Sequence, residues 1–339
     1  MSDYKIFGGK VHVYGDLHLS NAYKGQHKDY DYECYVNMEN IVKKVSNEKP
    51  SAVFFLGDIV GVTERNLKDR QFLSRVVLFF RTLNELTGGN VYSVKGNHDV
   101  GDFSDFDLLV TTGFLKNPDY VDYYGCSKSE YKGDESQLEV RFHFVNYGSE
   151  EKDLKLTNND SSNVVLGHAD YIIDGVTNWY KHKDSVNLAR LVNFIGVDLV
   201  VSGHIHNPSD EVLTTTIKGE DTIGLVYLGS PSRTAERYDD CWYMKFEYVG
   251  GSTEYNLDFF GLEPADKVFY PKEDFINDID EEELEAVKEN ESLTNIVKEI
   301  MELRMTSGDL FGQIKAVPHA DERVKQIACD YLKRAMNEE

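Results

Sequence analysis

The sequence of 339 residues has few cysteines and no long apolar run. Its four cysteines lie far apart and form no C-x-x-C pair, which argues against a zinc knuckle or a disulfide framework. No apolar run approaches the roughly 20 residues that a membrane-spanning helix needs, and the first residues lack the charged-then-apolar order of a signal peptide. We therefore expect free thiols and a soluble, cytoplasmic protein with no membrane partner.

Positive charge is also scarce. The chain has 36 Lys and Arg residues against 59 Asp and Glu residues, which gives a net charge of −23. Such a surface repels phosphate backbones, so general electrostatic attraction to nucleic acid is excluded. Any work on nucleic acid needs a local positive centre, and bound divalent metal ions supply one without changing the composition.

Hydrophobic residues make up 41% of the chain, enough for a substantial core. Five short apolar runs that end in polar residues predict strands: "KVHVYGDLH", "SAVFFLGDIV", "NVYSVKGNHD", "SNVVLGHAD" and "VDLVVSGHIH". Helical patterns over residues 32–46 and 67–86 separate the first three strands, and a further helix is expected over 186–194. This alternation predicts an α/β first half. Closely spaced strands after residue 210 predict that the second half closes with an antiparallel sheet.

Beyond residue 261 the sequence becomes charged and helical. Two segments there place their apolar residues on one helical stripe. We predict a main domain over 1–261 and a small helical appendage over 262–339. The acidic cluster at 278–285 is most simply a solvated helix start. The apolar stripe could pack on its own domain or dock on a partner.

The ends of the five strands carry a common set of side chains. These are Asp16, His18, Asp58, Asn97, His98, Asp99, His168, His204 and His206. They include five of the ten histidines. Ligands of open α/β sheets gather outside the carboxyl ends of the strands, so residues spread over about 190 positions can converge. Each motif alone is more often a turn with a satisfied histidine, but the five together indicate one site.

Oxygen and nitrogen donors without a thiolate suit a divalent ion such as Mn²⁺, Zn²⁺ or Fe²⁺. The donors are too many for one ion. Two ions roughly 3.5–4 Å apart need a bridging carboxylate, and Asp58, from the central strand, is the natural candidate. Such a pair clamps a phosphate ester and activates a water molecule, so the pattern predicts phosphoester hydrolysis.

The motifs "GDLH", "GDIV", "GNHD", "GHAD" and "GHIH" resemble, in order and spacing, those of the calcineurin-like metallophosphoesterases over about residues 11–260. The resemblance implies an α/β (α+β) fold, a two-sheet β-sandwich flanked by helices. It implies two metal ions. One would be held by Asp16, His18 and His206, the other by Asn97, His168 and His204, and Asp58 would bridge them. It also implies that His98 protonates the leaving oxygen or stabilises the transition state, while Asp99 orients the His98 ring.

A finer resemblance concerns "GHIHNP" and the later "VYLGSPSRT", a succession similar to that of the SbcD-type DNA repair nucleases. The C-terminal sequence resembles the short phage members of that group. The resemblance implies an Mn²⁺-dependent DNA endonuclease and exonuclease in the host cytoplasm, with an SbcC-type SMC-like ATPase docked on the C-terminal helices. It further implies a homodimer, for which the segment 30–45 could serve, although that segment could equally be a core helix. Ser230 and Arg233 could contact the phosphate backbone or make ordinary turn contacts.

Two features depart from that group or stay outside it. Gly61 occupies a position, three residues after the bridging aspartate, where SbcD-type proteins commonly have a polar residue or histidine. Residues 101–163 match no motif, and their stretch 122–136 is more simply a surface hairpin than a loop over the site. Two alternatives remain: a phosphodiesterase or phosphatase for small nucleotides or phosphoproteins, and a non-catalytic scaffold. The complete ligand set argues against the scaffold.

Overall fold

The computed structural model describes the chain in eleven segments. These are residues 4–20, 30–60, 70–100, 104–133, 137–157, 161–173, 185–209, 211–217, 221–231, 241–247 and 258–262. The chain divides into two units, Met1–Asp278 and Ile279–Glu339. The helices expected within 262–339 lie outside the described residues, so the appendage and its boundary stay predictions.

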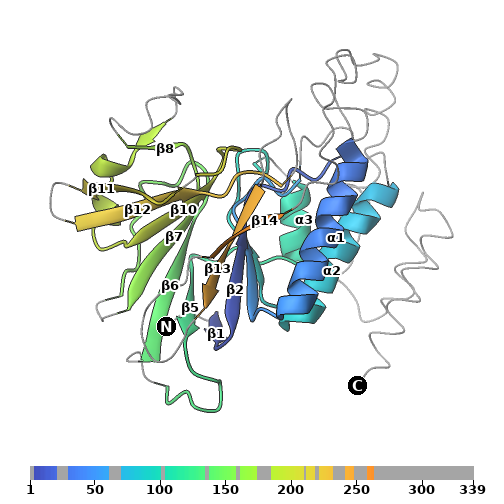
Figure 1. The fold of residues 1–339 in the computed structure, drawn as a ribbon, viewed down its shortest axis with the longest axis horizontal. Coiled ribbons are helices and arrows are strands. Elements are labelled where there is room, and N and C mark those ends of the chain that lie inside the picture. The colour runs from blue at the N-terminus through green and yellow to red at the C-terminus, as the bar shows by residue number, and fades with distance from the viewer. Residues whose placement is uncertain are drawn as a thin grey trace, which may run out of the picture. The chain divides into compact units, whose positions relative to one another are not determined.

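Two sheets form the centre of the fold, as Figure 1 shows. The larger sheet has the strand order β1-β5-β6-β7-β10-β12-β11, and the smaller has the order β14-β13-β2-β3-β4. A third, two-stranded sheet pairs β8 with β9. The strands are β1 (Lys5–Phe7), β2 (Lys10–Tyr14), β3 (Ala52–Phe55), β4 (Val91–Ser93), β5 (Tyr120–Tyr124), β6 (Leu138–Val145), β7 (Ser162–His168), β8 (Tyr171–Ile172), β9 (Val186–Asn187), β10 (Leu199–Gly203), β11 (Leu213–Ile217), β12 (Asp221–Tyr227), β13 (Cys241–Glu247) and β14 (Asp258–Leu262).

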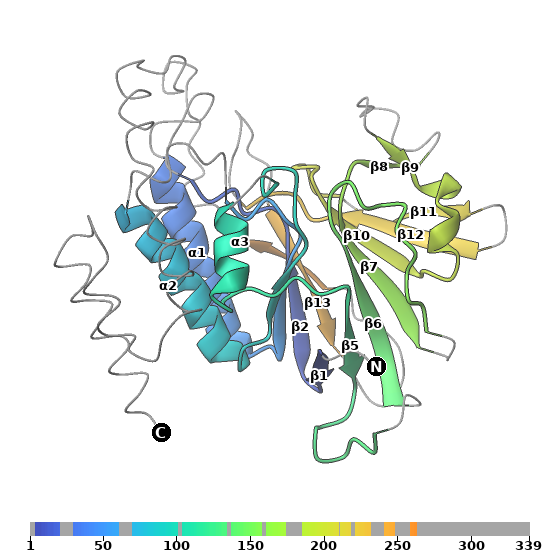
Figure 2. The same cartoon turned by 180° about the vertical axis from the view of Figure 1, so that it is seen from behind.

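Helices cover the outer face of the smaller sheet, seen from behind in Figure 2. They are α1 (Tyr30–Glu48), α2 (Arg70–Thr87) and α3 (Asp105–Thr111). The α/β prediction of two sheets flanked by helices is therefore confirmed. None of the helices among the described residues is long and apolar enough to cross a bilayer.

Strand β3 shows why the layers form. Alternate side chains of a strand point to opposite faces, so Val53 and Phe55 pack against the helices while Phe54 packs between the two sheets. A strand covered on both faces must be apolar throughout, as this one is. Its neighbours β2 and β4 run parallel to it, and α1 and α2 make the crossovers that parallel pairing requires.

The helix predicted over 186–194 is wrong. The segment forms β9, followed by two short 3₁₀ helices, Leu188–Arg190 and Val192–Phe194. Parallel pairing of β9 with β8 extends its first residues, and the Asn187 side chain accepts a hydrogen bond from the Ala189 amide to start the first 3₁₀ turn. Apolar periodicity over nine residues does not distinguish these conformations from an α-helix.

The closing antiparallel sheet is also a wrong prediction, because its four strands divide between the two main sheets. β11 and β12 pair antiparallel, but β12 joins the larger sheet parallel to β10. β13 pairs antiparallel with β14 and with β2 of the smaller sheet. Met244 and Phe246 of β13 thereby fill the space between the sheets. Strand periodicity encodes which face is buried, not which strand lies alongside.

The unmatched stretch 122–136 belongs to a β-hairpin, as expected. It joins β5 to β6, which pair antiparallel. Because β6 runs parallel to β7, the start of β6 lies at the end of the sheet opposite His168, the last residue of β7. The described part of this hairpin loop, residues 125–133, therefore lies away from the strand ends that carry the motifs.

Candidate metal centre

The five motifs lie at one end of the two sheets. Within each sheet, the strands that carry them run parallel. β2, β3 and β4 are parallel neighbours in the smaller sheet, and β7 and β10 are parallel neighbours in the larger one. The carboxyl ends of parallel strands meet at one sheet edge, where open α/β sheets gather ligands. The structure brings the nine motif side chains together there.

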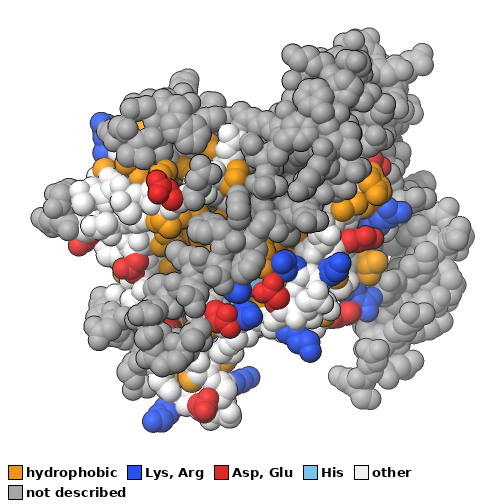
Figure 3. Space-filling model, viewed as in Figure 1, with side chains coloured by type: hydrophobic (Ala, Val, Ile, Leu, Met, Phe, Trp, Pro, Cys, Tyr) orange, Lys and Arg blue, Asp and Glu red, His pale blue; other side chains and the backbone are white. Residues whose placement is uncertain are grey.

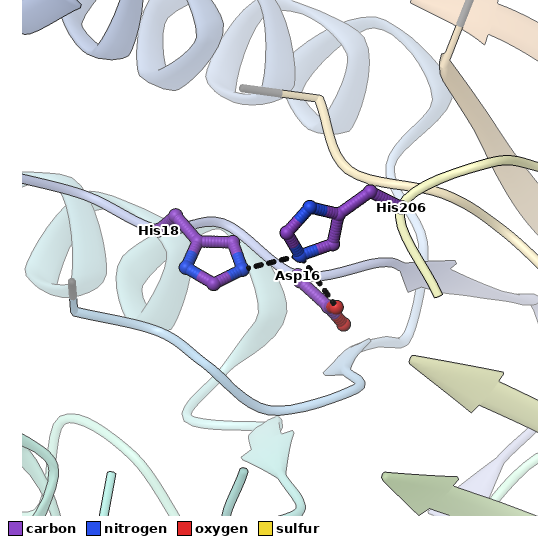
Figure 4. Close-up of side chains that lie close together, drawn as sticks. All are labelled: Asp16, His18 and His206. Carbon is purple, nitrogen blue, oxygen red and sulfur yellow. Dashed lines mark hydrogen bonds and ion pairs between the residues drawn. The ribbon is translucent and has the colours of Figure 1, made fainter. Parts of the chain in front are cut away.

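Asp16, His18 and His206 form the first group of candidate ligands (Figure 4). The Nε2 atoms of His18 and His206 are 2.9 Å apart, and His206 Nε2 is 3.8 Å from Asp16 Oδ2. Asp16 and His18 are buried, whereas the His206 side chain is 32% exposed. This half-open position suits a site that must admit a substrate.

Asn97, His168 and His204 form the second group. The Asn97 side-chain oxygen is 2.9 Å from His168 Nε2 and 2.9 Å from His204 Nδ1. His168 Nδ1 lies 2.7 Å from the Leu56 carbonyl, to which it donates. That bond places a proton on Nδ1 and directs His168 Nε2 at the centre of the group.

Asp58 lies between the two groups. Its Oδ2 is 3.6 Å from His18 Nε2 and 3.3 Å from His168 Nε2, so one oxygen approaches a member of each. Its Oδ1 accepts a hydrogen bond of 2.8 Å from the His98 amide. The position agrees with the bridging role that the resemblance implies.

Divalent ions fit these residues on two observations. Ligands bound at right angles with bonds of about 2.1 Å lie about 3 Å apart, close to the 2.9 Å separations within both groups. Asp16 Oδ1 is buried and has no hydrogen-bond partner among the described residues. An unsatisfied buried carboxylate oxygen is costly, and a cation would satisfy it.

The charges of the centre point the same way. Burial, opposed in part by His168, raises the pKa of Asp16 well above its ordinary value, and the neighbouring Asp58 raises it further. Burial also lowers the pKa of His18 and brings that of His206 to about 4. Both imidazoles are thus kept neutral, the form that binds metal. At His168 the effect of burial is outweighed by Asp16 and Asp58, which raise its pKa to about 9, so without a cation this imidazole carries the positive charge between the carboxylates. A divalent ion between the carboxylates would take over that charge and release the proton.

Three ligand positions have unusual backbone conformations. His18, Asp58 and His204 have φ angles of +46°, +44° and +74°, in the left-handed region that non-glycine residues seldom adopt. Such residues cost of order 1–3 kcal/mol each and cluster at functional sites.

His98 and Asp99 lie beside the candidate ligands, but Asp99 does not make the contact with the His98 ring that the resemblance implies. The His98 ring packs edge-on against His18, with 5.3 Å between centroids. Asp99 is buried, and its carboxylate accepts hydrogen bonds from the amides of Gly96 (2.9 Å) and Ile59 (3.1 Å). In the described segments it makes no hydrogen bond to the His98 ring. The orienting role is corrected accordingly: Asp99 joins the backbones of the loops that carry Asp58 and Asn97.

Ser230 lies close to the first group. Its hydroxyl donates to the Asp16 carbonyl at 2.8 Å, and its amide donates to the His206 carbonyl at 3.3 Å. These bonds join the loops that follow β12, β2 and β10. The predicted phosphate contact of Ser230 stays a prediction, and Arg233 and Gly61 lie outside the described residues.

Tyr147 lies beside the second group, although none of the sequence motifs includes it. Its ring centroid is 5.9 Å from that of His204 and 6.3 Å from that of His168. A signal was present, because "RFHFVNYG" is one more apolar run ending in a polar loop. That run is β6, which lies parallel to β7 in the larger sheet.

When bound, two divalent ions would clamp a phosphate ester and lower the pKa of a bound water molecule. The protein's own groups hold the donors in place through Leu56, Asp99 and Ser230, and the His98 ring stands at the edge of the centre. Most of the donors are buried, so the low local dielectric strengthens every interaction with a developing charge.

Comparison with known proteins agrees with this geometry. The family model of the calcineurin-like phosphoesterases matches residues 9–208, which contain every candidate ligand. No curated protein matches the chain. Similar solved structures include the calcineurin-like phosphoesterase YfkN from Bacillus subtilis, with 16% identity over 83% of this chain and 98% of that one and a TM-score of 0.44. Another is Yfce, a phosphoesterase from E. coli, with 16% identity over 70% of this chain and 88% of that one and a TM-score of 0.34. The chain belongs to the calcineurin-like phosphoesterase family, whose chemistry is divalent-metal phosphoester hydrolysis.

Proposed function

We propose that this protein is an Mn²⁺-dependent DNA nuclease, the endonuclease and exonuclease subunit of an SbcCD-type recombination and repair complex. The observation that carries the proposal is the position of Ser230. It comes from the "GSPSRT" segment that resembles the SbcD-type nucleases, and it bonds the Asp16 and His206 backbones beside the first ligand group. Ser230 is thereby held close to the ligand group at which the phosphodiester would bind.

In this proposal each ligand group holds one ion, Asp58 bridges the two, and Mn²⁺ is the metal used, with Zn²⁺ or Fe²⁺ as alternatives. The donors are carboxylate, amide and imidazole groups without a thiolate, a set that these ions share. His98 is the catalytic residue that protonates the leaving oxygen or stabilises the transition state. The hydrogen bond that its backbone amide donates to Asp58 Oδ1 fixes the His98 backbone relative to the proposed bridging carboxylate.

The acidic net charge is compatible with DNA cleavage if binding does not rest on this subunit alone. On the face in Figure 3, acidic and basic side chains of the described residues are interspersed and do not form one acidic patch. Many of the acidic residues occur in 262–339, including the run "DIDEEELE". The ions and the basic surface of an SbcC-type ATPase, docked on the C-terminal segment, would together hold the DNA.

A second candidate is a phosphodiesterase or phosphatase that acts on small nucleotides or phosphoproteins. The net charge of −23 favours it, because a small substrate bound directly at the ions does not have to cross an acidic surface with many phosphates. A homodimer through α1 is compatible with both candidates, since Tyr32 on that helix is 57% exposed.

Cleavage of linear DNA by the full chain in Mn²⁺, with and without the ATPase partner, tests the proposal. His98→Asn should lower the rate about 10²- to 10⁴-fold, the range expected for a lost proton donor, while metal analysis still finds both ions. Purification of the tagged chain from its native host should recover a large coiled-coil ATPase. Turnover of cyclic nucleotides or phosphopeptides, with no DNA cleavage under either condition, would establish the second candidate instead.

A further inference from the structure

The loop after β6 holds Tyr147 in a fixed position beside the ligand loop after β4. The Tyr147 amide donates to the Lys95 carbonyl at 2.9 Å, and the Lys95 amide donates to the Asn146 side chain at 2.7 Å. Asn146 in turn donates to Asn117 at 3.1 Å, and Asn117 donates to the Ser93 carbonyl at 2.7 Å. This network fixes Tyr147 relative to Asn97, which lies two residues after Lys95.

The Tyr147 ring does not contribute to the hydrophobic cores. It is half-buried and belongs to none of the three hydrophobic cores. Within the part of the chain that the structure describes, its hydroxyl makes no hydrogen bond. The ring lies against the imidazoles of the second ligand group, at interplanar angles of 36° to His204 and 76° to His168. Aromatic side chains commonly line substrate-binding sites, and this one stands on a hydrogen-bonded loop at a candidate metal centre.

The lysine beside Tyr147 does not offer its positive charge freely to a substrate. Lys95, the lysine of the adjoining loop, is paired with Asp107, with 3.0 Å between Nζ and Oδ1. Among the described residues, a substrate group next to Tyr147 therefore meets an aromatic face and not the Lys95 ammonium group, which is paired. Planar, uncharged and aromatic groups fit such a face, and the nucleobase is the part of a nucleotide with those properties.

We propose that Tyr147 stacks on the nucleobase of the nucleotide whose phosphate lies at the second ligand group. The inference rests on the proposed phosphodiester hydrolysis and adds the residue that contacts the base. Stacking of a base on a protein aromatic ring strengthens binding roughly 5- to 150-fold and tolerates any base sequence. It therefore adds affinity that an acidic protein does not obtain from charge.

The test measures the binding of thymidine 5′-phosphate and of methyl phosphate to the full chain in Mn²⁺ by calorimetry. The wild type should prefer the nucleotide, and Tyr147→Ala should reduce the ratio of the two affinities on the order of tenfold. Tyr147→Phe should keep most of the ratio, because it keeps the ring. Tyr131→Ala is the matched control, since Tyr131 is a half-buried tyrosine in the hairpin loop at the opposite end of the sheet.

Turnover gives a second measurement with two chromogenic diesters, thymidine 5′-(p-nitrophenyl phosphate) and methyl p-nitrophenyl phosphate. In Tyr147→Ala the preference for the thymidine diester should fall through KM. An unchanged preference in Tyr147→Ala, or an equal loss in Tyr147→Phe, would overturn the stacking. If the wild type hydrolyses neither diester and no DNA, the proposed function fails, and the binding ratio still decides the role of Tyr147.

Discussion

Replacing Gly96 by alanine should displace the metal ligands while leaving the rest of the fold in place. A Cβ atom at Gly96 would lie 2.1 Å from Asp58 Oδ1 and 2.4 Å from the Asp58 amide nitrogen. Rotation of the Asp58 side chain relieves only the first contact, because the second is to backbone. The two loops must therefore move apart, and Asp58 and Asn97 move with them.

The size of the movement follows from the contacts. Cβ atoms essentially never approach other heavy atoms within 3.0 Å, so the Asp58 amide must retreat by at least about 0.6 Å from 2.4 Å. Metal–ligand distances tolerate only about 0.2 Å. The overpacking itself costs about 1–3 kcal/mol of unfolding free energy, which a core of this size should survive. Metal affinity is thus lost before the fold.

Metal analysis and thermal unfolding with and without Mn²⁺ provide the assay. At Mn²⁺ concentrations of 100 times Kd, each bound ion should stabilise the wild type by about 2.7 kcal/mol, a Tm increase of about 5–10 °C. Gly96→Ala should show little of that increase. Gly113→Ala is the control, because its φ is +78° and a Cβ there meets nothing within 4 Å. It should cost about 1 kcal/mol and keep the Mn²⁺ response. Two ions bound to Gly96→Ala with the full increase in Tm would refute the reasoning.

Three further outcomes are expected. Burial lowers the pKa of His143 from 6.5 to about 4, so below pH 6.5 the unfolded chain binds more protons than the folded one. Its contribution of about 3 kcal/mol should be lost as the pH falls from 6.5 toward 4, and His143→Gln should flatten that slope in urea titrations. Asp122→Ala leaves the buried Arg141 guanidinium without the carboxylate that it binds at 2.6 Å, which should cost about 3–5 kcal/mol. The double variant Asp122→Leu with Arg141→Met should recover much of that loss, and no recovery would contradict the ion-pair explanation. Chelation by EDTA should abolish phosphodiester hydrolysis, and added Mn²⁺ should restore it. Activity that persists in protein shown by metal analysis to contain no metal would exclude the two-ion site.

Local sequence patterns predicted both long helices of the described chain. The helices predicted over 32–46 and 67–86 are found as α1 and α2, with ends shifted by one to three residues. Their apolar periodicity is long enough to exclude a strand. The nine residues 186–194 were too few for that distinction, and pairing of β9 with β8 decided their conformation.

The candidate ligands were accessible from the sequence because each follows an apolar strand, and parallel strands bring their ends to one edge. The resemblance implies that Asp99 orients the His98 ring, but the Asp99 carboxylate instead accepts hydrogen bonds from the Gly96 and Ile59 amides. Adjacent residues often point apart, and only the turn geometry decides which groups a buried carboxylate meets.

By itself, the sequence determined the α/β class, the strand ends that bear the candidate ligands and the kind of ion that their donors would suit, because burial and donor chemistry are local properties. Tertiary structure decided the division of the last four strands between two sheets, the contact of Ser230 with Asp16 and the place of Tyr147 beside His168 and His204. These depend on which distant segments pair. Apolar periodicity sets the face that each segment buries, and packing of the whole chain selects the partner that covers it.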